Sequence, residues 1–370
     1  MNYLVIYSFA LILSFSFSLS AQTTKKYETD KAVVAWELLL QRGDVIWGFD
    51  FLPSGEILFT ERSGKLFKYN PTSGKVDALQ GVPTVYSQGQ GGLLDVKVHP
   101  DFAKNKLILF SYSEPIGKEA TTSVIRAQLT DKGLKKVKRI FRAKAQGNED
   151  IHFGGRIEFE NSKHFFLSVG DRNERNKAQS LKDHNGKILR LDMEGKAPAD
   201  NPFVKDKEAL SEIWSLCHRH PQGLMRDPRN GELWGVEFGP RGGDELNRIE
   251  KGKNYGWPLF TQGKEYWGPS IGEAVSKPGF EEPVVNWTPS ISPSGAALYI
   301  GDKLPMWTGD MFLANLAATH LRRLRFKEGK VIEQEVLLKD MASRFRNVRQ
   351  SPDGFLYIST DDGKIGRLTK

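Results

Sequence analysis

Residues 49–69 read FDFLPSGEILFTERSGKLFKY, and residues 347–368 read NVRQSPDGFLYISTDDGKIGRL. Each stretch consists of an apolar segment, a P-x-G turn, a second apolar segment, a polar turn that contains glycine, and a third apolar segment. Within the segments, apolar and polar residues alternate with a period of two, as half-buried β-strands require. Proline favours the first turn and glycine tolerates positive φ. Each stretch therefore predicts three antiparallel strands joined by tight turns.

Four weaker copies of this unit lie between the two stretches, namely VKVHPDFAKNKLILFSYS, IEFENSKHFFLSVGD, LMRDPRNGELWGVEFG and SPSGAALYIGD. The turn positions expected for the six units recur at intervals of 47 to 67 residues and are Pro53, Pro100, Asn161, Pro228, Pro293 and Pro352. A four-stranded blade takes about 40–50 residues, so most units also carry long loops. The repeats predict an all-β fold, a six-bladed β-propeller with four antiparallel strands per blade. A row of separate β-sandwiches is the alternative, but no low-complexity linker divides the chain.

The ends of the chain are expected to close this ring. Residues 32–40, AVVAWELLL, have the composition of a strand and are expected to complete the last blade. Residues 22–31 are more polar, and we expect them to form a flexible N-terminal segment. The remaining residues, 32–370, are expected to form one propeller domain.

The N-terminus has the features of an export signal. Residues 4–21 carry no charge, and the polar run QTTKKYETDK follows them. This pattern indicates a signal peptide over residues 1–21, with a retained membrane anchor as the alternative. The only cysteine is Cys217, so no intramolecular disulfide can form. We expect a periplasmic or secreted bacterial protein with no stable membrane insertion after signal cleavage.

The charge of the chain points to an anionic partner. The net charge is +8 at pH 7, which favours nucleic acid, anionic glycans or a small polyanionic cofactor. Nucleic acid is excluded here because the basic residues are spread along the chain, export is expected, and no nucleic-acid-binding motif is present.

Five polar segments are candidates for a composite site, and each is assigned to a different unit. They are GQGGLLD (89–95), HFGGR (152–156), CHRHPQG (217–223), FGPRGGDE (238–245) and RFRN (344–347). Because all units of a propeller approach one axis, segments that are distant in sequence are able to converge there. Function is not fixed by this fold, so it has to be argued from these residues.

The residue types in these segments suit an anion and a hard cation. Arg344 and Arg346 stand at i and i+2 of a strand, so both point to one face, where they would hold a carboxylate or an orthoquinone. A solvated basic strand is the alternative. The run GPRGGDE would present backbone carbonyls and a carboxylate to Ca²⁺, which prefers oxygen ligands. An ordinary glycine-rich turn is the alternative.

Eight segments in order resemble a known family. They are GQGGLLDVKVHPDF, HFGGRIEF, LSVGDR, GKILRLD, HRHPQGL, GPRGGDELNRIEKGKNYGWP, YIGDKLPMWTGDMFLANL and RFRNVRQSPDGFLY. The chain resembles the soluble, pyrroloquinoline quinone (PQQ)-dependent glucose/sorbosone and aldose sugar dehydrogenases from about Trp47 to Leu368. This resemblance implies a periplasmic six-bladed propeller that uses PQQ and calcium.

The resemblance implies that His152 is the general base. It would take the proton of the anomeric hydroxyl of an aldose while a hydride leaves C1 for C5 of PQQ, which gives the lactone. Imidazole suits this role because its ordinary pKa lies near the working pH. The electrons would then pass to an external acceptor, which the sequence does not identify.

The resemblance also assigns cofactor and metal contacts. The carbonyls of Gly239 and Pro240 would bind the catalytic calcium, while Glu245 and the carbonyl of Tyr255 would bind a further, structural calcium. The residues that match cofactor contacts are Gln90, Arg219, His220, Asp244, Tyr266, Arg344 and Arg346.

Three residues depart from the family pattern. His220 stands where asparagine is usual, Phe238 where a polar residue is common, and Ala317 where a lysine usually contacts the cofactor. Loss of a charge-assisted contact costs about 2–3 kcal/mol. These departures leave a non-catalytic propeller that binds a glycan or a protein as an alternative. A calcium-dependent lactonase is a further alternative, because some six-bladed propellers are lactonases. The arginine-rich segments suit an anionic cofactor better than a hydrolase, and the intact His152 favours the dehydrogenase.

Overall fold

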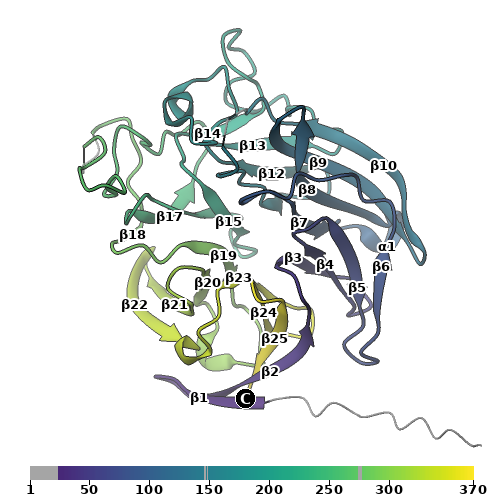
Figure 1. Cartoon of the computed structure of the whole chain (residues 1–370). Coiled ribbons are helices and arrows are strands. Elements are labelled where there is room, and N and C mark those ends of the chain that lie inside the picture. The colour runs from purple at the N-terminus through teal and green to yellow at the C-terminus, as the bar shows by residue number, and fades with distance from the viewer. Residues whose placement is uncertain (1–23, 146, 148, 274–276) are drawn as a thin grey trace, which may run out of the picture.

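The computed structural model describes residues 24–145, 147, 149–273 and 277–370. The expected signal peptide therefore lies outside the described residues. The described strands form six antiparallel sheets arranged in a ring (Figure 1). This arrangement confirms the predicted six-bladed β-propeller. None of the helices in the described part of the chain is long and apolar enough to cross a membrane.

Blades 1 to 5 follow one another along the chain, and each is a four-stranded sheet. Blade 1 contains β3 (Ile46–Phe51), β4 (Ile57–Glu61), β5 (Lys65–Tyr69) and β6 (Val76–Leu79). Blade 2 contains β7 (Leu93–Val98), β8 (Leu107–Ile116), β9 (Glu119–Thr130) and β10 (Gly133–Arg142). Blade 3 contains β11 (Ile157–Phe159), β12 (His164–Val169), β13 (Lys187–Asp192) and β14 (Ile213–Leu216). Blade 4 contains β15 (Pro221–Arg226), β16 (Leu233–Glu237), β17 (Asp244–Ile249) and β18 (Val285–Trp287). Blade 5 contains β19 (Pro293–Leu298), β20 (Met311–Asn315), β21 (His320–Lys327) and β22 (Lys330–Leu337).

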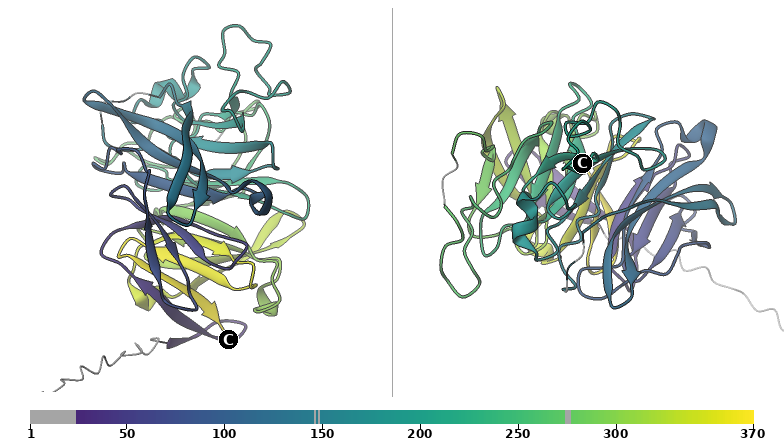
Figure 2. Two further views of the ribbon diagram at one scale, coloured as in Figure 1. Left: turned by 90° about the vertical axis from the view of Figure 1, so that its right-hand side faces the viewer. Right: turned by 90° about the horizontal axis from the view of Figure 1, so that it is seen from above.

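Blade 6 joins the two ends of the chain. Its strands β23 (Phe345–Gln350), β24 (Leu356–Thr360) and β25 (Lys364–Thr369) are continued by β2 (Val33–Gln41), which pairs with β25. Residues 32–40 therefore close the ring as predicted. Figure 2 shows the C-terminus beside the N-terminal strands of the described chain.

Regular secondary structure is present within residues 22–31, which the sequence analysis expected to form a flexible N-terminal segment. The flexibility of this segment stays a prediction. Thr24–Glu28 form β1, a fifth strand of blade 6 that pairs with β2. β1 is an edge strand whose residues are exposed apart from the half-buried Tyr27, which packs on the core. A strand with one apolar contact has little hydrophobic alternation, so the sequence pattern did not reveal it.

The predicted turns connect the first and second strands of five blades. Pro293 is the exception, because it is the first residue of β19. The corresponding connection of blade 5 spans residues 299–310 and contains the short helix η2 (Pro305–Trp307). The segment SPSGAALYIGD is thus mainly the inner strand itself. Three other short helices, α1 (Phe102–Asn105), η1 (Arg175–Gln179) and η3 (Lys339–Met341), also lie in connections.

The core lies between the blades. Each pair of neighbouring blades shares a cluster of buried apolar side chains. Burial of apolar area at about 25 cal/mol per Å² makes these interfaces the main stabilising contribution. The inner strands β3, β7, β11, β15, β19 and β23 contact one another in ring order. The loops that precede these strands are therefore held close to the axis.

Candidate active site

A cavity of 240 Å³ lies where these loops meet. All six blades contribute to its lining, through residues that include Trp47, Arg62, Gln90, Phe153, His220, Leu316 and Arg346. Each of the five predicted segments supplies at least one lining residue. The segments therefore converge at this cavity, as expected for loops near the axis of a propeller. Segments 217–223 and 238–245 both belong to blade 4, which corrects their assignment to different units. The second of them forms the connection between β16 and β17.

His152 stands in a loop that runs against the neighbouring strand. Its own φ is +55°, in the left-handed region, and Gly154 follows with φ of +69°. A Cβ at Gly154 would lie 2.7 Å from the carbonyl oxygen of Ser168, so only glycine fits without a shift. The side-chain oxygen of Gln90 accepts a hydrogen bond of 2.8 Å from the His152 backbone N–H. The glycines thus allow the tight path that presents His152.

Asp171 fixes the orientation of the His152 ring. Asp171 Oδ1 lies 2.7 Å from His152 Nδ1, and its Oδ2 accepts a hydrogen bond of 2.8 Å from Trp257 Nε1. His152 is 4% exposed, and burial followed by the charge of Arg219 lowers its pKa. Burial raises the pKa of Asp171, but the hydrogen bond to His152 and nearby cations outweigh burial and lower it overall.

These contacts assign the protonation state of the pair. Asp171 is ionised and His152 is neutral, so Nδ1 carries the proton and donates it to Asp171. Nε2 is then the basic atom, and it makes no hydrogen bond to other described residues. The arrangement is that of a general base with an orienting carboxylate. The sequence analysis assigned no role in the site to Asp171 or Trp257.

The predicted arginine pair lies at the cavity and is held by a carboxylate. Asp361 accepts hydrogen bonds from Arg346 Nε at 2.7 Å and Nη2 at 3.0 Å, and from Arg344 Nε at 3.0 Å. The side chain of Arg346 is 12% exposed and that of Arg344 is 53% exposed. Burial raises the pKa of Asp361, but Arg346 and Arg344 outweigh burial and lower it overall. Asp361 is a further lining residue that the sequence analysis missed.

The predicted cofactor contacts Arg219 and His220 come from the loop before β15. Arg219 Nη1 donates to the carbonyl of Phe238 at 3.1 Å, and its guanidinium lies 5.5 Å from the centre of the Trp257 ring. The imidazole of His220 packs on that of His152, with 4.8 Å between ring centroids. Both residues therefore adjoin the base.

The turn at residues 238–245 is organised by Asp244. Its carboxylate accepts hydrogen bonds from Gly239 N at 2.9 Å, Ser290 Oγ at 2.7 Å and Ser292 N at 2.6 Å. The carbonyl of Pro240 accepts a hydrogen bond of 3.0 Å from Lys264 N. A Cβ at Gly239 would lie 2.2 Å from the carbonyl oxygen of Gly242. The predicted contact of Asp244 with a cofactor stays a prediction, since its observed role is to support the turn.

Glu245 and Tyr255 line a separate cavity of 20 Å³. Glu281, Glu282 and Asn286 also line it. Both polar atoms of the Asn286 amide are buried and have no hydrogen-bond partner among the described residues. Burial, followed by the charge of Glu237, raises the pKa of Glu245 well above its ordinary value. A cavity needs about 10–15 Å³ to hold one water, so this acidic cavity has room for a single ion.

Tyr266 lies outside the main cavity. Its side chain is 68% exposed, and its carbonyl accepts a hydrogen bond of 3.1 Å from Arg241 Nη1. Ala317, at the position of the usual lysine, is exposed beside the lining residue Leu316. The contact of Tyr266 with a cofactor remains a prediction.

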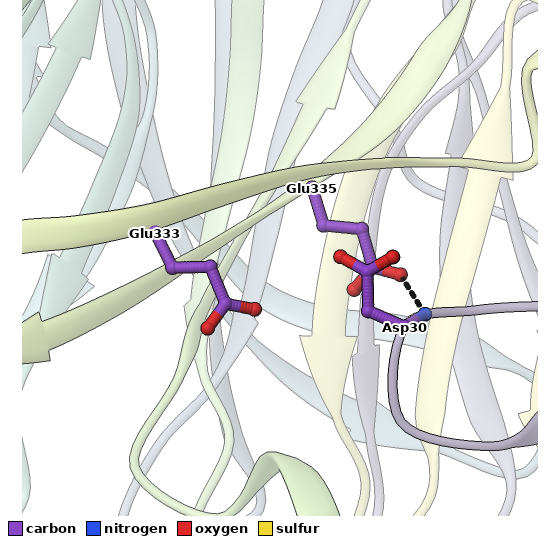
Figure 3. Close-up of side chains that lie close together, drawn as sticks. All are labelled: Asp30, Glu333 and Glu335. Carbon is purple, nitrogen blue, oxygen red and sulfur yellow. Dashed lines mark hydrogen bonds between the residues drawn. The ribbon is translucent and has the colours of Figure 1, made fainter.

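A third acidic group joins the N-terminal segment to blade 5. Asp30, Glu333 and Glu335 lie close together, and Asp30 N donates a hydrogen bond of 2.6 Å to Glu335 (Figure 3). The fully buried Arg323 pairs with both glutamates and with Asp310. Because Arg323 already pairs with Glu333 and Glu335, we assign no cation to this group.

The fold and site define a six-bladed propeller with a buried histidine–aspartate pair beside an arginine-lined cavity. Residues 44–370 match the Glucose / Sorbosone dehydrogenase family, and the chain belongs to this family. It is 42% identical over 347 residues to aldose sugar dehydrogenase YliI of Escherichia coli, covering 92% of this chain and 93% of the relative.

Two solved structures extend the comparison. The soluble aldose sugar dehydrogenase from Escherichia coli in the apo-form has a TM-score of 0.86 at 40% identity, covering 91% of this chain and 99% of that chain. The PQQ-bound form of aldose sugar dehydrogenase from Streptomyces coelicolor has a TM-score of 0.78 at 26% identity, covering 94% and 99%.

Proposed function

We propose that the protein oxidises the anomeric carbon of an aldose to the lactone, with PQQ as cofactor, and passes the electrons to an external acceptor. The observation that carries this proposal is the neutral His152 whose Nε2 remains available while Asp171 holds Nδ1. A sugar hydroxyl needs a base of this kind when its carbon loses a hydride. The name of the Escherichia coli relative and the PQQ-bound relative support the same reaction.

The lining fits a planar polyanion. The lining residues Arg344 and Arg346 bring guanidinium groups suited to carboxylate and quinone oxygens. Arg219, which donates to the carbonyl of the lining residue Phe238, adds a guanidinium group beside the cavity. Arg62, which the sequence analysis did not single out, adds a further cation to the lining. His220 Nδ1 is buried without a partner among the described residues, so a bound acceptor group would satisfy it. These donors, with Gln90, are the residues that would hold PQQ.

Within this proposal the chain supplies the base and its orientation. His152 Nε2 takes the proton of the C1 hydroxyl, and Asp171 stabilises the imidazolium that forms. PQQ, when bound, would supply the hydride acceptor. The carbonyls of Gly239 and Pro240 would hold a calcium ion, which would supply Lewis-acid polarisation. We further propose export to the periplasm or the medium, in keeping with the segment expected to be a signal peptide.

Reconstitution tests the proposed function directly. We expect the chain without residues 1–21 to reduce a dye only when Ca²⁺, PQQ and an aldose are all present. A panel of aldoses then compares substrates by kcat/KM. Absence of both PQQ binding and turnover would contradict the proposal and favour the non-catalytic binding module.

A second calcium is proposed at the cavity lined by Glu245 and Tyr255, where the Glu245 carboxylate and the backbone carbonyl of Tyr255 would be its ligands. We expect Ca²⁺ to raise the melting temperature of the apo protein by on the order of 5 °C, because a ligand that binds only the native state stabilises it. Glu245→Gln is expected to remove most of this rise. Differential scanning calorimetry at several Ca²⁺ concentrations measures it.

Glu333→Gln is the matched control, since Glu333 belongs to the acidic group that arginine neutralises. It is expected to keep the calcium-dependent rise in melting temperature. If the calcium-dependent rise in melting temperature persisted in Glu245→Gln and disappeared in Glu333→Gln, Ca²⁺ would bind at the acidic group that contains Glu333. The proposed site at Glu245 would then be wrong.

A further inference from the structure

Gln222 has a fixed amide orientation, and this determines the tautomer of His220. Gln222 Nε2 donates a hydrogen bond of 3.0 Å to the carbonyl of Gly154, and its Oε1 lies 3.4 Å from Arg346 Nη1. The amide nitrogen also lies 2.9 Å from His220 Nε2. An amide NH₂ only donates, so His220 Nε2 accepts and carries no proton. The proton of neutral His220 is therefore on Nδ1.

A second proton on His220 is strongly disfavoured by its surroundings. It would have to bind at Nε2, toward which one hydrogen of the Gln222 amide already points. Burial and then the proximity of His152 hold the pKa of His220 well below its ordinary value. The charged groups that face it are Arg219 from its own loop, Arg346 from β23 and Arg172 from the segment after β12.

The neutral ring of His220 covers the ring of the base. The two imidazoles are 4.8 Å apart between centroids and inclined by 34°. Phe238 packs edge-on against His220 at 5.1 Å and 75°. His152 and His220 are 4% and 2% exposed. Water is therefore excluded from the shared surface of the two rings.

We propose that Gln222 and His220 together are positioning residues for the base. Gln222 locks His220 as a neutral imidazole with its proton on Nδ1, and the His220 ring keeps His152 neutral, desolvated and aligned. This inference rests on the proposed function, in which His152 Nε2 accepts the proton of the substrate. The groups that face His152 are Asp171 and Arg172 from the segment after β12 and Arg219 from the loop before β15.

The first test is nuclear magnetic resonance of the apo protein labelled with ¹⁵N-histidine. We expect His220 to show an unprotonated Nε2 and a protonated Nδ1, and to remain neutral through the range of about pH 5–8 in which free histidine titrates. His152 is expected to titrate below its ordinary value. A protonated Nε2 on His220, or protonation of His220 before His152, would overturn the proposal.

Two substitutions of His220 distinguish the contribution of its ring from that of its nitrogen atoms. His220→Asn removes the ring and restores the residue usual in the family motif, so folding is expected to be preserved. Opening the face of His152 to water should then shift its titration midpoint up toward about 6.5. His220→Phe keeps a neutral ring against His152 and should leave the midpoint low. The partly exposed His164 of β12 provides the control His164→Asn, which should leave His152 unchanged.

The titration midpoint of His152 should also appear in the pH dependence of kcat. Because neutral His152 is the active form, kcat falls as the pH drops through the titration midpoint of His152. His220→Asn should therefore move the acidic limb of the kcat–pH profile toward higher pH. An unchanged midpoint in His220→Asn would overturn the positioning role. These titrations use no PQQ, so their failure is distinguishable from a failure of the proposed function, which appears as a wild-type protein that does not bind PQQ.

Discussion

His152→Gln is expected to lower kcat of the reconstituted enzyme by about a hundred- to ten-thousandfold, the range for loss of a general base. Glutamine keeps a polar group of similar reach but has no basic atom near neutral pH. The PQQ dissociation constant should change little, because the lining arginines remain. Steady-state dye reduction gives kcat, and fluorescence titration of the apo protein with PQQ gives the dissociation constant.

His164→Gln is the control for this substitution. His164 lies in β12 and contacts Glu160, and its side chain is 27% exposed. We expect its kcat to stay close to that of the wild type, because His164 neither lines the cavity nor contacts His152. If His152→Gln kept wild-type kcat while binding PQQ normally, the base would be another residue and the proposed role of His152 would be wrong.

Both carboxylates that the sequence analysis missed are explained by local hairpin register. In blade 3, Ile157 pairs with Leu167, so continuing this register places residue 152 opposite residue 172, next to Asp171. In blade 6, Phe345 pairs with Thr360, which brings Asp361 beside Arg344. The P-x-G and Asn turns predicted these hairpins, but in blade 6 the register extended from the turn would place Asp362 opposite Arg344. A bulge between Phe345 and Asn347 shifts the register by one residue and brings Asp361 there instead, and the sequence pattern did not reveal this bulge.

Contacts between blades are beyond such local reasoning. The packing of His220 on His152 joins blade 4 to blade 3, and the hydrogen bond from Trp257 to Asp171 does the same. Their geometry depends on the angle and spacing of neighbouring blades, which a single sequence does not specify. The repeats did predict that such loops would converge, and the identity of the converging segments was confirmed by the cavity lining.

The fold was predictable because its unit is repeated along the chain. Strand, turn and strand recur with the same alternation in most units, so an error at one unit leaves the number of blades unchanged. Pro293 shows this, because the turn of blade 5 lies elsewhere while the blade itself is present. β1 shows the limit, since an exposed edge strand buries little and leaves a weak hydrophobic pattern.

Arg346→Leu is expected to weaken PQQ binding by roughly 30- to 150-fold. Loss of charge-assisted hydrogen bonds worth about 2–3 kcal/mol corresponds to roughly 30- to 150-fold. The substitution also leaves the carboxylate of Asp361 in the lining with only the more exposed Arg344 as its partner. A dianionic or more highly charged cofactor would then meet a less compensated negative charge. Titration of the apo protein in Ca²⁺, followed by tryptophan fluorescence, measures the dissociation constant.

Arg344→Leu and a double variant make this result specific. Arg344 is 53% exposed against 12% for Arg346, and exposed ion pairs contribute about 0.2–1 kcal/mol, so Arg344→Leu should weaken binding by only about two- to fivefold. Adding Asp361→Asn to Arg346→Leu removes the uncompensated carboxylate and should recover part of the lost affinity. Equal and small effects of the two single arginine substitutions would mean that the anion binds away from this pair. Full retention of affinity in Arg346→Leu would show that the other cations of the lining hold the cofactor without it.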